Sequence, residues 1–164
     1  MVFSLLSRFP VRHCTAICRR KATTQIVFDR ELKRQQRDDS VKLDVNNDYD
    51  YLRTEIAERL VDRLDDITRT FPVGLDISCH KGHILNSLLK RDSLLSPGDC
   101  AGGVKTLVQC DMSQEALHRI PASLLNQTDK ITTHVLQADE EQLPFEPNSY
   151  DIVFCNLGKY GMCL

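Results

Sequence analysis

The sequence predicts an α/β protein whose core is a doubly wound parallel sheet. Four short runs rich in apolar and β-branched residues are separated by segments with helical spacing or by turn-rich loops. These runs are residues 73–77, 106–110, 131–137 and 150–155. Three of them have an acidic residue at or just after their carboxyl end, at Asp76, Asp111 and Asp139. Sheets of this kind bind ligands beyond the carboxyl ends of their strands, so we expect the functional site at these acids.

The chain is organised around the first strand and the helix after it, residues 71–85. A proline precedes the strand, and a loop containing serine and glycine ends it. Beyond this loop, apolar residues recur at helical spacing, at Ile84, Leu85, Leu88 and Leu89. We therefore expect a cofactor site in the loop from Ser78 to Gly82.

Two segments precede this strand. Residues 26–39 carry mixed charges and few apolar anchors, which predicts a solvated helix or an extended lead-in, and residues 40–48 are expected to form a linker or turn. An amphipathic helix then begins at Asp50 and ends before Phe71, because a proline follows. Its predicted buried stripe is narrow and consists of Leu52, Ile56, Leu60, Leu64 and Ile67.

The later elements continue the alternation of strands and helices. A glycine-rich loop over 96–103 leads to the second strand, and a helix over 112–120 follows with Ser113 as its N-cap. Its expected inward residues are Ala116, Leu117 and Ile120. A connector with two prolines, 143–149, separates the third strand from the fourth. The fourth strand is apolar enough to predict burial on both faces.

The length and composition indicate a single domain. The 164 residues are 41% hydrophobic, which is enough for one core. The formal net charge of −2 gives no reason to expect nucleic acid or an anionic membrane as a partner. Seven cysteines without a C-x-x-C pair argue against a disulfide framework.

The first 25 residues have the composition of a mitochondrial transit peptide. Residues 1–28 contain no acid, whereas basic residues are interspersed with apolar ones, at Arg8, Arg12, Arg19, Arg20 and Lys21. The apolar runs are too short to span a bilayer, which takes about 20 residues. A disordered basic tail is the alternative interpretation, and we prefer targeting to mitochondria.

The acids at the strand ends, followed by Leu143-Pro-Phe145 and by Tyr150-Asp-Ile-Val153, resemble the class I S-adenosylmethionine-dependent methyltransferases. This resemblance implies a Rossmann-like sheet with its strands in the order 3-2-1-4. It also implies S-adenosyl-L-methionine as the cofactor.

The same resemblance assigns a role to each strand end. The loop from Asp76 through Ser78 to Gly82 would approach the methionine and adenosine parts of the cofactor. At the end of the second strand, Asp111 with the adjacent Met112 would meet the ribose hydroxyls. Beyond the third strand, the acids beside the adenine would be Asp139 and Glu140.

The chain is most similar to one mitochondrial branch of this family, the protein arginine hydroxylases that assist assembly of respiratory complex I. Residues 27–34 resemble its F-D-R-x-L-K-R segment, which the methyltransferase fold does not require, and residues 50–52, 71–76 and 138–145 also resemble it. The resemblance implies a complex I subunit as the protein substrate. It also implies a place in the mitochondrial matrix or peripheral to the inner membrane, without a transmembrane segment.

The loop after the first strand departs from the family pattern. It reads Asp76-Ile-Ser-Cys-His-Lys-Gly82 and keeps the last of three expected glycines, so Ser78 and His80 each add a side chain where the cofactor would lie. Weakened or lost cofactor binding is therefore an alternative expectation. It would make the protein a non-catalytic pseudoenzyme or a module that binds an assembly partner.

The end of the chain also departs from the family. The sequence stops at Leu164, before the fifth strand of the family fold. We expect a C-terminally truncated form in which the fourth strand is an exposed edge. The expected parts are a transit peptide over 1–25, a charged lead-in and linker over 26–48, and a partial methyltransferase-like domain over 49–164.

Other interpretations of the site residues are simpler or less supported. Asp76 could cap the next helix, and Asp111 could be an acid favoured at a helix N-terminus. A C-H-x-x-H cluster includes Cys79, His80 and His83, but structural zinc needs four ligands and no second pair stands at finger spacing, so we expect no metal. Nucleophilic catalysis by Cys79 is disfavoured, and so is an NAD site, because no G-x-G-x-x-G follows the first strand.

Overall fold

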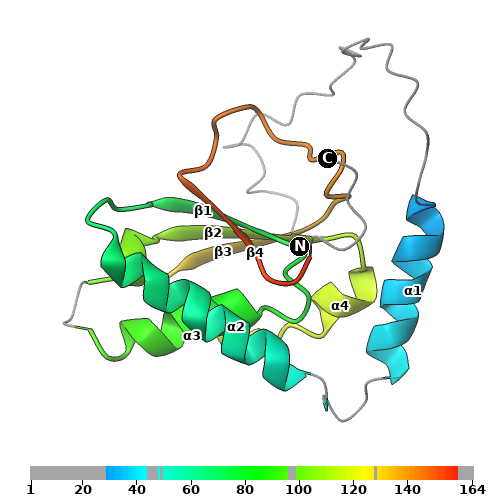
Figure 1. The fold of residues 1–164 in the computed structure, drawn as a ribbon, viewed down its shortest axis with the longest axis horizontal. Helices are drawn as coiled ribbons and strands as arrows, with labels where there is room; N and C mark the ends of the chain where they lie inside the picture. Colours follow the sequence, from blue (N-terminus) through cyan, green and yellow to red (C-terminus); the bar gives the residue numbers. More distant parts are fainter. Residues whose placement is uncertain (1–28, 44–47, 49, 96–98, 128, 159–164) are drawn as a thin grey trace.

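The fold is built on four parallel strands (Figure 1). The computed structural model describes residues 29–43, 48, 50–95, 99–127 and 129–158. Its strands are β1 (Val73–Ile77), β2 (Thr106–Asp111), β3 (Thr132–Gln137) and β4 (Ile152–Cys155). Neighbouring strands are parallel throughout, in the order β3-β2-β1-β4. The predicted strands, their order and the α/β class are confirmed.

The two faces of the sheet are covered differently. Helices α2 (Asp50–Asp62) and α3 (His83–Asp92) lie side by side over one face, where they bury Leu107 and Phe154 (Figure 1). Leu75 and Val108 point to the other face, which the connector between β3 and β4 covers with Leu143, Phe145 and Tyr150. Asp76 pairs with Gln109 across the ladder, and the alternation of side chains places both on the face covered by the helices.

Helix α2 begins at Asp50 as predicted and continues into a short 3-10 helix, η2 (Arg63–Asp66). Its predicted buried stripe is wrong in part, because Leu52 and Ile67 are exposed. Of the predicted stripe, Leu64 is fully buried, and it shares a core cluster with Ala57, Val61 and residues of α3. The prediction counted large side chains at a spacing of four, whereas the contact with α3 uses a small alanine that lets the helices approach closely.

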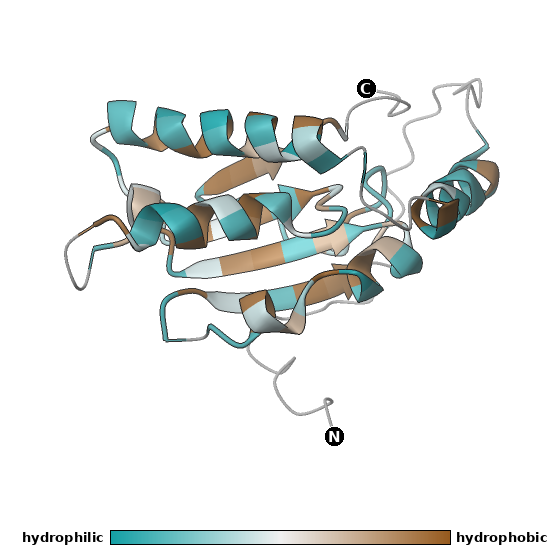
Figure 2. Ribbon diagram, turned by 90° about the horizontal axis from the view of Figure 1, so that it is seen from below, coloured by the Kyte–Doolittle hydropathy of each residue, from teal (hydrophilic) through white to brown (hydrophobic). Residues whose placement is uncertain are grey.

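Helix α3 follows the pattern predicted from the sequence. Its apolar positions are all buried, at Ile84, Leu85, Leu88 and Leu89. Figure 2 shows hydrophobic residues concentrated in the strands, whereas α2 and α3 mix hydrophobic and hydrophilic residues. This pattern is expected for helices that bury one face on a sheet.

The connection from β2 to β3 contains two short helices, α4 (Gln114–His118) and α5 (Ala122–Leu125). Ser113 caps α4 as predicted, because its hydroxyl accepts a hydrogen bond from the backbone N–H of Ala116 at 3.1 Å. The helix is shorter than the predicted range 112–120, since Pro121 disfavours helical geometry at the residue before it. The predicted inward residues are buried. A 3-10 turn, η3 (Ala101–Gly103), precedes β2.

Helix α1 (Arg30–Leu43) is the main correction to the sequence-based fold. The lead-in was predicted to be solvated, and residues 40–48 to be a linker or turn. Instead the helix runs through residues 40–43, buries Val41, and lies beside α4 at the carboxyl end of the sheet (Figure 1). Its arginines pair with Asp111 at the end of β2 and with Glu140 after β3, which is why a helix with few apolar anchors packs against the domain.

Strand β4 is the second correction. The prediction that it is buried on both faces is wrong, because Phe154 is buried whereas the side chain of Val153 is 54% exposed. Within the described residues β4 pairs with β1 on one side and has no strand on the other, so it is the expected apolar edge. The transit peptide predicted over 1–25 lies outside the described residues. No helix in the described part of the chain is long and apolar enough to cross a membrane.

Candidate cofactor site

The acids predicted at the strand ends come together in the structure. Asp76 lies near the end of β1, and Asp111 ends the neighbouring strand β2. Glu140 and Asp139 follow β3, the next strand in the sheet. Arg37 links two of these strand ends, since it pairs with both Asp111 and Glu140. The predicted convergence of acids from three strands is therefore found.

Asp76 is fully buried, and its two carboxylate oxygens have no hydrogen-bond partner within the described residues. Burial, with the charge of Asp111 as a smaller cause, raises the pKa of Asp76 well above its ordinary value. Burial of this kind disfavours the charged form of a carboxylate, and a cationic group paired with it would favour that form. The side chain is thus poised to accept a positively charged ligand group.

The loop after β1 keeps a backbone that normally requires glycine. Ser78, His80 and Gly82 have φ values of 57°, 54° and 78°, in the left-handed region. These are the three positions at which the family pattern D-x-G-x-G-x-G has glycine. The loop therefore retains the glycine-type path although two of its glycines are replaced.

The replacing side chains are accommodated in different ways. The hydroxyl of Ser78 donates a hydrogen bond to Glu140, and the side chain is buried. A Cβ on Gly158, after β4, would lie 2.4 Å from that of Ser78, so the serine takes space that a side chain at 158 would need. At Gly82, a Cβ would lie 3.1 Å from the side-chain oxygen of Gln109, which favours glycine there.

Asp111 connects the loop after β1 to the end of β2 by hydrogen bonding. One carboxylate oxygen accepts the backbone N–H of His80 at 3.1 Å. The other oxygen accepts the backbone N–H of Ser113 at 2.9 Å and contacts the guanidinium of Arg37 at 3.2 Å. Met112, the predicted neighbour of Asp111 in the site, is buried beside it, and its carbonyl accepts a hydrogen bond from Gln137.

The acids after β3 are neutralised by α1. Arg30 pairs with both Asp139 and Glu140 at 2.6 Å, and Arg37 also pairs with Glu140. Burial by itself would raise the pKa of Glu140, but the hydrogen bond from Ser78 and the charge of Arg37 lower it overall. The guanidinium of Arg30 similarly lowers the pKa of Asp139 despite partial burial.

Sequence reasoning missed Arg30 and Arg37. Both lie in the segment that was predicted to be solvated, and the acids they contact are at least 74 positions away in the sequence. One signal could have found them. The two arginines are seven positions apart, so they lie on the same face of a helix, and no apolar stripe on that helix offers another way to dock it.

The surroundings of Cys79 disfavour a role as a nucleophile. Its thiol is buried, and burial together with the nearby carboxylates raises its pKa well above the ordinary value. The reactive form of cysteine is the thiolate, which this environment disfavours. The sequence-based judgement against nucleophilic catalysis therefore has a structural basis.

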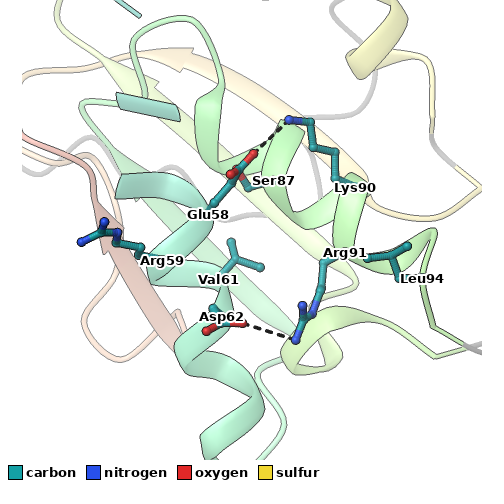
Figure 3. Close-up of a pocket in the computed structure, with 8 residues that line it drawn as sticks. All are labelled: Glu58, Arg59, Val61, Asp62, Ser87, Lys90, Arg91 and Leu94. Carbon is teal, nitrogen blue, oxygen red and sulfur yellow. Dashed lines mark hydrogen bonds and ion pairs between the residues drawn. The ribbon is translucent and has the colours of Figure 1, made fainter. Parts of the chain in front are cut away.

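A cavity of about 380 Å³ lies between α2 and α3 (Figure 3), and none of the acids at the strand ends lines it. Its lining residues are Glu58, Arg59, Val61, Asp62, Ser87, Lys90, Arg91 and Leu94. Ion pairs cross it between Glu58 and Lys90 at 3.0 Å and between Asp62 and Arg91 at 3.4 Å. We attribute it to the packing of two charged helix surfaces and not to the cofactor site.

The residues at the strand ends offer hydrogen-bond acceptors that fit the polar groups of S-adenosylmethionine. This cofactor carries a positively charged amino group and sulfonium, together with two ribose hydroxyls. Asp76 offers an unpaired buried carboxylate, and the loop 78–82 offers a backbone that can approach a ligand closely. Asp111 offers carboxylate oxygens that Arg37 contacts in this structure.

Comparison with known proteins identifies the family. A family model described as a methyltransferase domain matches residues 75–158, which is half of the chain and includes the loop and all four acids. The chain belongs to this methyltransferase family. The matched part begins in β1 and ends after β4, so it coincides with the sheet.

Two curated relatives extend the likeness beyond the family domain. The protein named "Arginine-hydroxylase NDUFAF5, mitochondrial" from Danio rerio is 36% identical over 134 residues, which cover 82% of this chain and 36% of the relative. The protein of the same name from Mus musculus is 38% identical over 131 residues, covering 80% and 33%. The chain thus spans about a third of the length of these relatives.

A solved structure is also similar. It is the plantazolicin methyltransferase BpumL in complex with SAH, which is 21% identical to this chain with a TM-score of 0.46. The match covers 75% of this chain and 41% of that one.

Proposed function

We propose that this chain binds S-adenosyl-L-methionine at the carboxyl ends of β1, β2 and β3, as a mitochondrial protein of the arginine-hydroxylase type that acts in complex I assembly. The observation that carries the proposal is Asp76, whose buried and unpaired carboxylate lies beside a loop with the glycine-type backbone of the family. The relatives named arginine hydroxylases support arginine as the substrate group, and the sequence resemblance supports an arginine within a protein. For the assembly role, the proposal rests on the sequence resemblance to complex I assembly proteins.

Each strand end has a distinct task in this proposal. The carboxylate of Asp76 accepts the cationic amino group of the cofactor, which restores a partner to a buried charge. Backbone N–H groups of the loop 78–82 approach the methionine part. Asp111 accepts the ribose hydroxyls once Arg37 turns away from it, and Asp139 with Glu140 lies beside the adenine. When bound, the cofactor would supply an activated methyl group on a sulfonium, which serves methylation, and a hydroxylation at the same site would need a separate oxidant as the source of the oxygen atom.

The proposal is tested by isothermal titration of the full chain with S-adenosylmethionine. We expect saturable binding, and the variant Asp111→Ala should bind about tenfold more weakly or worse, because hydrogen bonds to a charged group are lost. The matched control is Asp129→Ala, an exposed acid in the turn before β3, which should bind as the wild type does. No heat at millimolar cofactor would overturn the proposal in favour of a pseudoenzyme or a partner-binding module.

The proposal also places the protein in mitochondria, in the matrix or on the matrix face of the inner membrane. The supporting observations are the basic, acid-free leader and the relatives named mitochondrial. Residues 1–25 fused to a fluorescent reporter should direct it to mitochondria. Replacing the arginines of the leader with glutamine should abolish import, and a diffuse cytosolic signal from the unchanged fusion would contradict the proposal.

The proposed parts of the chain follow from the same reasoning. Residues 1–25 are the targeting segment, and residues 49–164 hold the partial methyltransferase-like domain. The charged lead-in over 26–48 includes α1, whose arginines form ion pairs with the acids of the site. We therefore propose that the lead-in contributes to the cofactor site in addition to connecting the two other parts.

A further inference from the structure

Three potential metal ligands meet beside the cofactor loop. Asp50 is the first residue of α2, His80 lies in the loop after β1, and His83 is the first residue of α3. One ligand atom from each lies within 4.8 Å of the other two. The imidazole rings of His80 and His83 are stacked, with centroids 5.9 Å apart and an angle of 24° between their planes. The tertiary fold thus brings a carboxylate to the histidine pair, from 30 positions earlier in the sequence.

His83 is arranged as metal-binding histidines are. One ring nitrogen, Nδ1, lies 3.3 Å from the hydroxyl of Thr54, and such a contact orients the ring. The other, Nε2, is buried and has no hydrogen-bond partner among the described residues. The whole side chain is more than nine-tenths buried, so this nitrogen is also shielded from water. Nε2 faces Asp50 at 3.7 Å from its Oδ1, which is too long for a hydrogen bond.

This distance is close to the separation of two ligands on one metal ion. Zinc ligands lie about 2.0–2.2 Å from the metal in a tetrahedral arrangement, so two nitrogen or oxygen ligands are about 3.4 Å apart. This pair needs a contraction of about 0.3 Å to reach that geometry, and the three ligand atoms together, which lie within 4.8 Å of one another, need a larger one. A cation between the two atoms would satisfy a buried nitrogen and a carboxylate oxygen at once.

We propose that Asp50, His80 and His83 form a binding site for a divalent transition-metal ion. Two imidazoles and one carboxylate are the protein ligands of several zinc enzymes and of the non-haem iron(II) oxygenases. Such sites leave further coordination positions for water or a ligand. Here Asp50 and His83 line a cavity of about 360 Å³ that also includes Lys81, Gly82 and Arg119, which provides room for one.

Lys81 opposes metal binding and sets its strength. Its ammonium lies 3.1 and 3.0 Å from the two oxygens of Asp50. A carboxylate has about four lone-pair positions, so Asp50 can bind a metal and still accept from Lys81. The adjacent positive charge nevertheless disfavours a second cation. Removing that charge should therefore strengthen metal binding, a direction that general structural damage does not produce.

The metal site is separate from the proposed cofactor groups but shares their loop. The backbone N–H of His80 is bonded to Asp111, whereas its side chain belongs to the cluster with Asp50. The proposal does not depend on S-adenosylmethionine, because no cofactor atom takes part in the ligand set. It departs from the sequence-based expectation of no metal, which considered ligands close together in the sequence.

The test is titration of the full, metal-free chain with Zn²⁺ by calorimetry and with Co²⁺ by visible absorption. We expect one equivalent of each metal to bind. The variants His83→Ala and His80→Ala should each weaken binding at least about tenfold, the lower limit for changes around metal sites, and Thr54→Val should weaken it about tenfold through His83. The control His118→Ala removes an exposed histidine at the end of α4 and should bind as the wild type does.

A second variant keeps the test decisive if histidine variants fold poorly. Lys81→Met should bind Zn²⁺ more tightly than the wild type, and circular dichroism should show the same helix content. The proposal is overturned if Co²⁺ gives no absorption bands of a protein-bound ion, or if Lys81→Met binds more weakly. Bands of Co²⁺ bound to thiolate would likewise overturn it, since they would assign the metal to cysteines.

Discussion

Replacing Arg37 with alanine is expected to lower the free energy of unfolding by about 3 kcal/mol, because it removes the partner of two buried carboxylates. The side chain of Glu140 is fully buried and that of Asp111 nearly so. Breaking a buried ion pair leaves an uncompensated charge, which costs more than the pair itself contributes. Arg30 still pairs with Glu140 in the variant, which keeps the loss near the lower end of the range for such pairs.

Urea denaturation at neutral pH measures this loss. The matched control is Arg34→Ala on the same helix, whose exposed pair with Glu31 should contribute less than about 1 kcal/mol. Hydrogen exchange should also show faster opening of α1 in Arg37→Ala than in Arg34→Ala. Equal stability of the two variants would show that α1 is not held to the sheet by its arginines.

The same ion pair gives a dependence on pH with a defined sign. The pKa of Glu140 is lower in the folded state than its ordinary value near 4.3. Its contribution to stability is therefore present above about pH 4.3 and is lost as the pH falls through the folded-state value. Arg37→Ala should lose less stability than the wild type on acidification, because less of this contribution remains to be lost.

Replacing Asp76 with asparagine is expected to raise the free energy of unfolding at pH 7 by about 2 kcal/mol and to weaken S-adenosylmethionine binding. The folded state raises the pKa of Asp76, so folding at neutral pH requires either a buried charge or the uptake of a proton. Asparagine has nearly the same shape and avoids both costs, and the cost of burying its unpaired neutral amide is smaller than that of a charge. The variant should thus be more stable and yet less able to bind a cationic ligand group.

The pH dependence separates this effect from a general change in packing. Because the folded-state pKa is raised, Asp76 destabilises the wild type above the unfolded value near 3.9, and this cost disappears as the pH falls to that value. The advantage of Asp76→Asn should therefore shrink from pH 7 toward pH 4. Thermal unfolding across this range measures it, with Asp66→Asn as the exposed control. A variant less stable than the wild type at pH 7 would contradict the assignment of Asp76 as an unpaired buried acid.

The strands could be predicted because their signals are local. Val73, Leu75 and Ile77 alternate within one run, and the acid at Asp76 and the loop after it stand next to that run. Parallel order then follows from the helices between the strands, so the convergence of Asp76 and Asp111 could be predicted before any coordinates. The burial of β4 was overestimated, because a run of apolar residues looks the same in a central strand and in an edge strand.

The partners of those acids could not be predicted in the same way. Arg37 and Glu140 are 103 positions apart, and neither has a sequence neighbour that indicates the pair. The loop shows the same limit, because the replacement of glycine at Ser78 and His80 predicted only that two side chains enter the space of the cofactor. The structure instead keeps positive φ at both positions, and it directs the Ser78 hydroxyl to Glu140.

The sequence by itself determined the strands and the edge at which acids gather, because each depends on periodicity and turns within a few residues, and the order of the strands followed from the resemblance to the methyltransferase family. Only the tertiary structure decided that α1 covers those acids with Arg30 and Arg37. It likewise decided that Asp50 meets His80 and His83. These contacts join segments far apart in the chain. Their stability comes from burial and charge pairing, which exist only after the sheet and its helices have packed together.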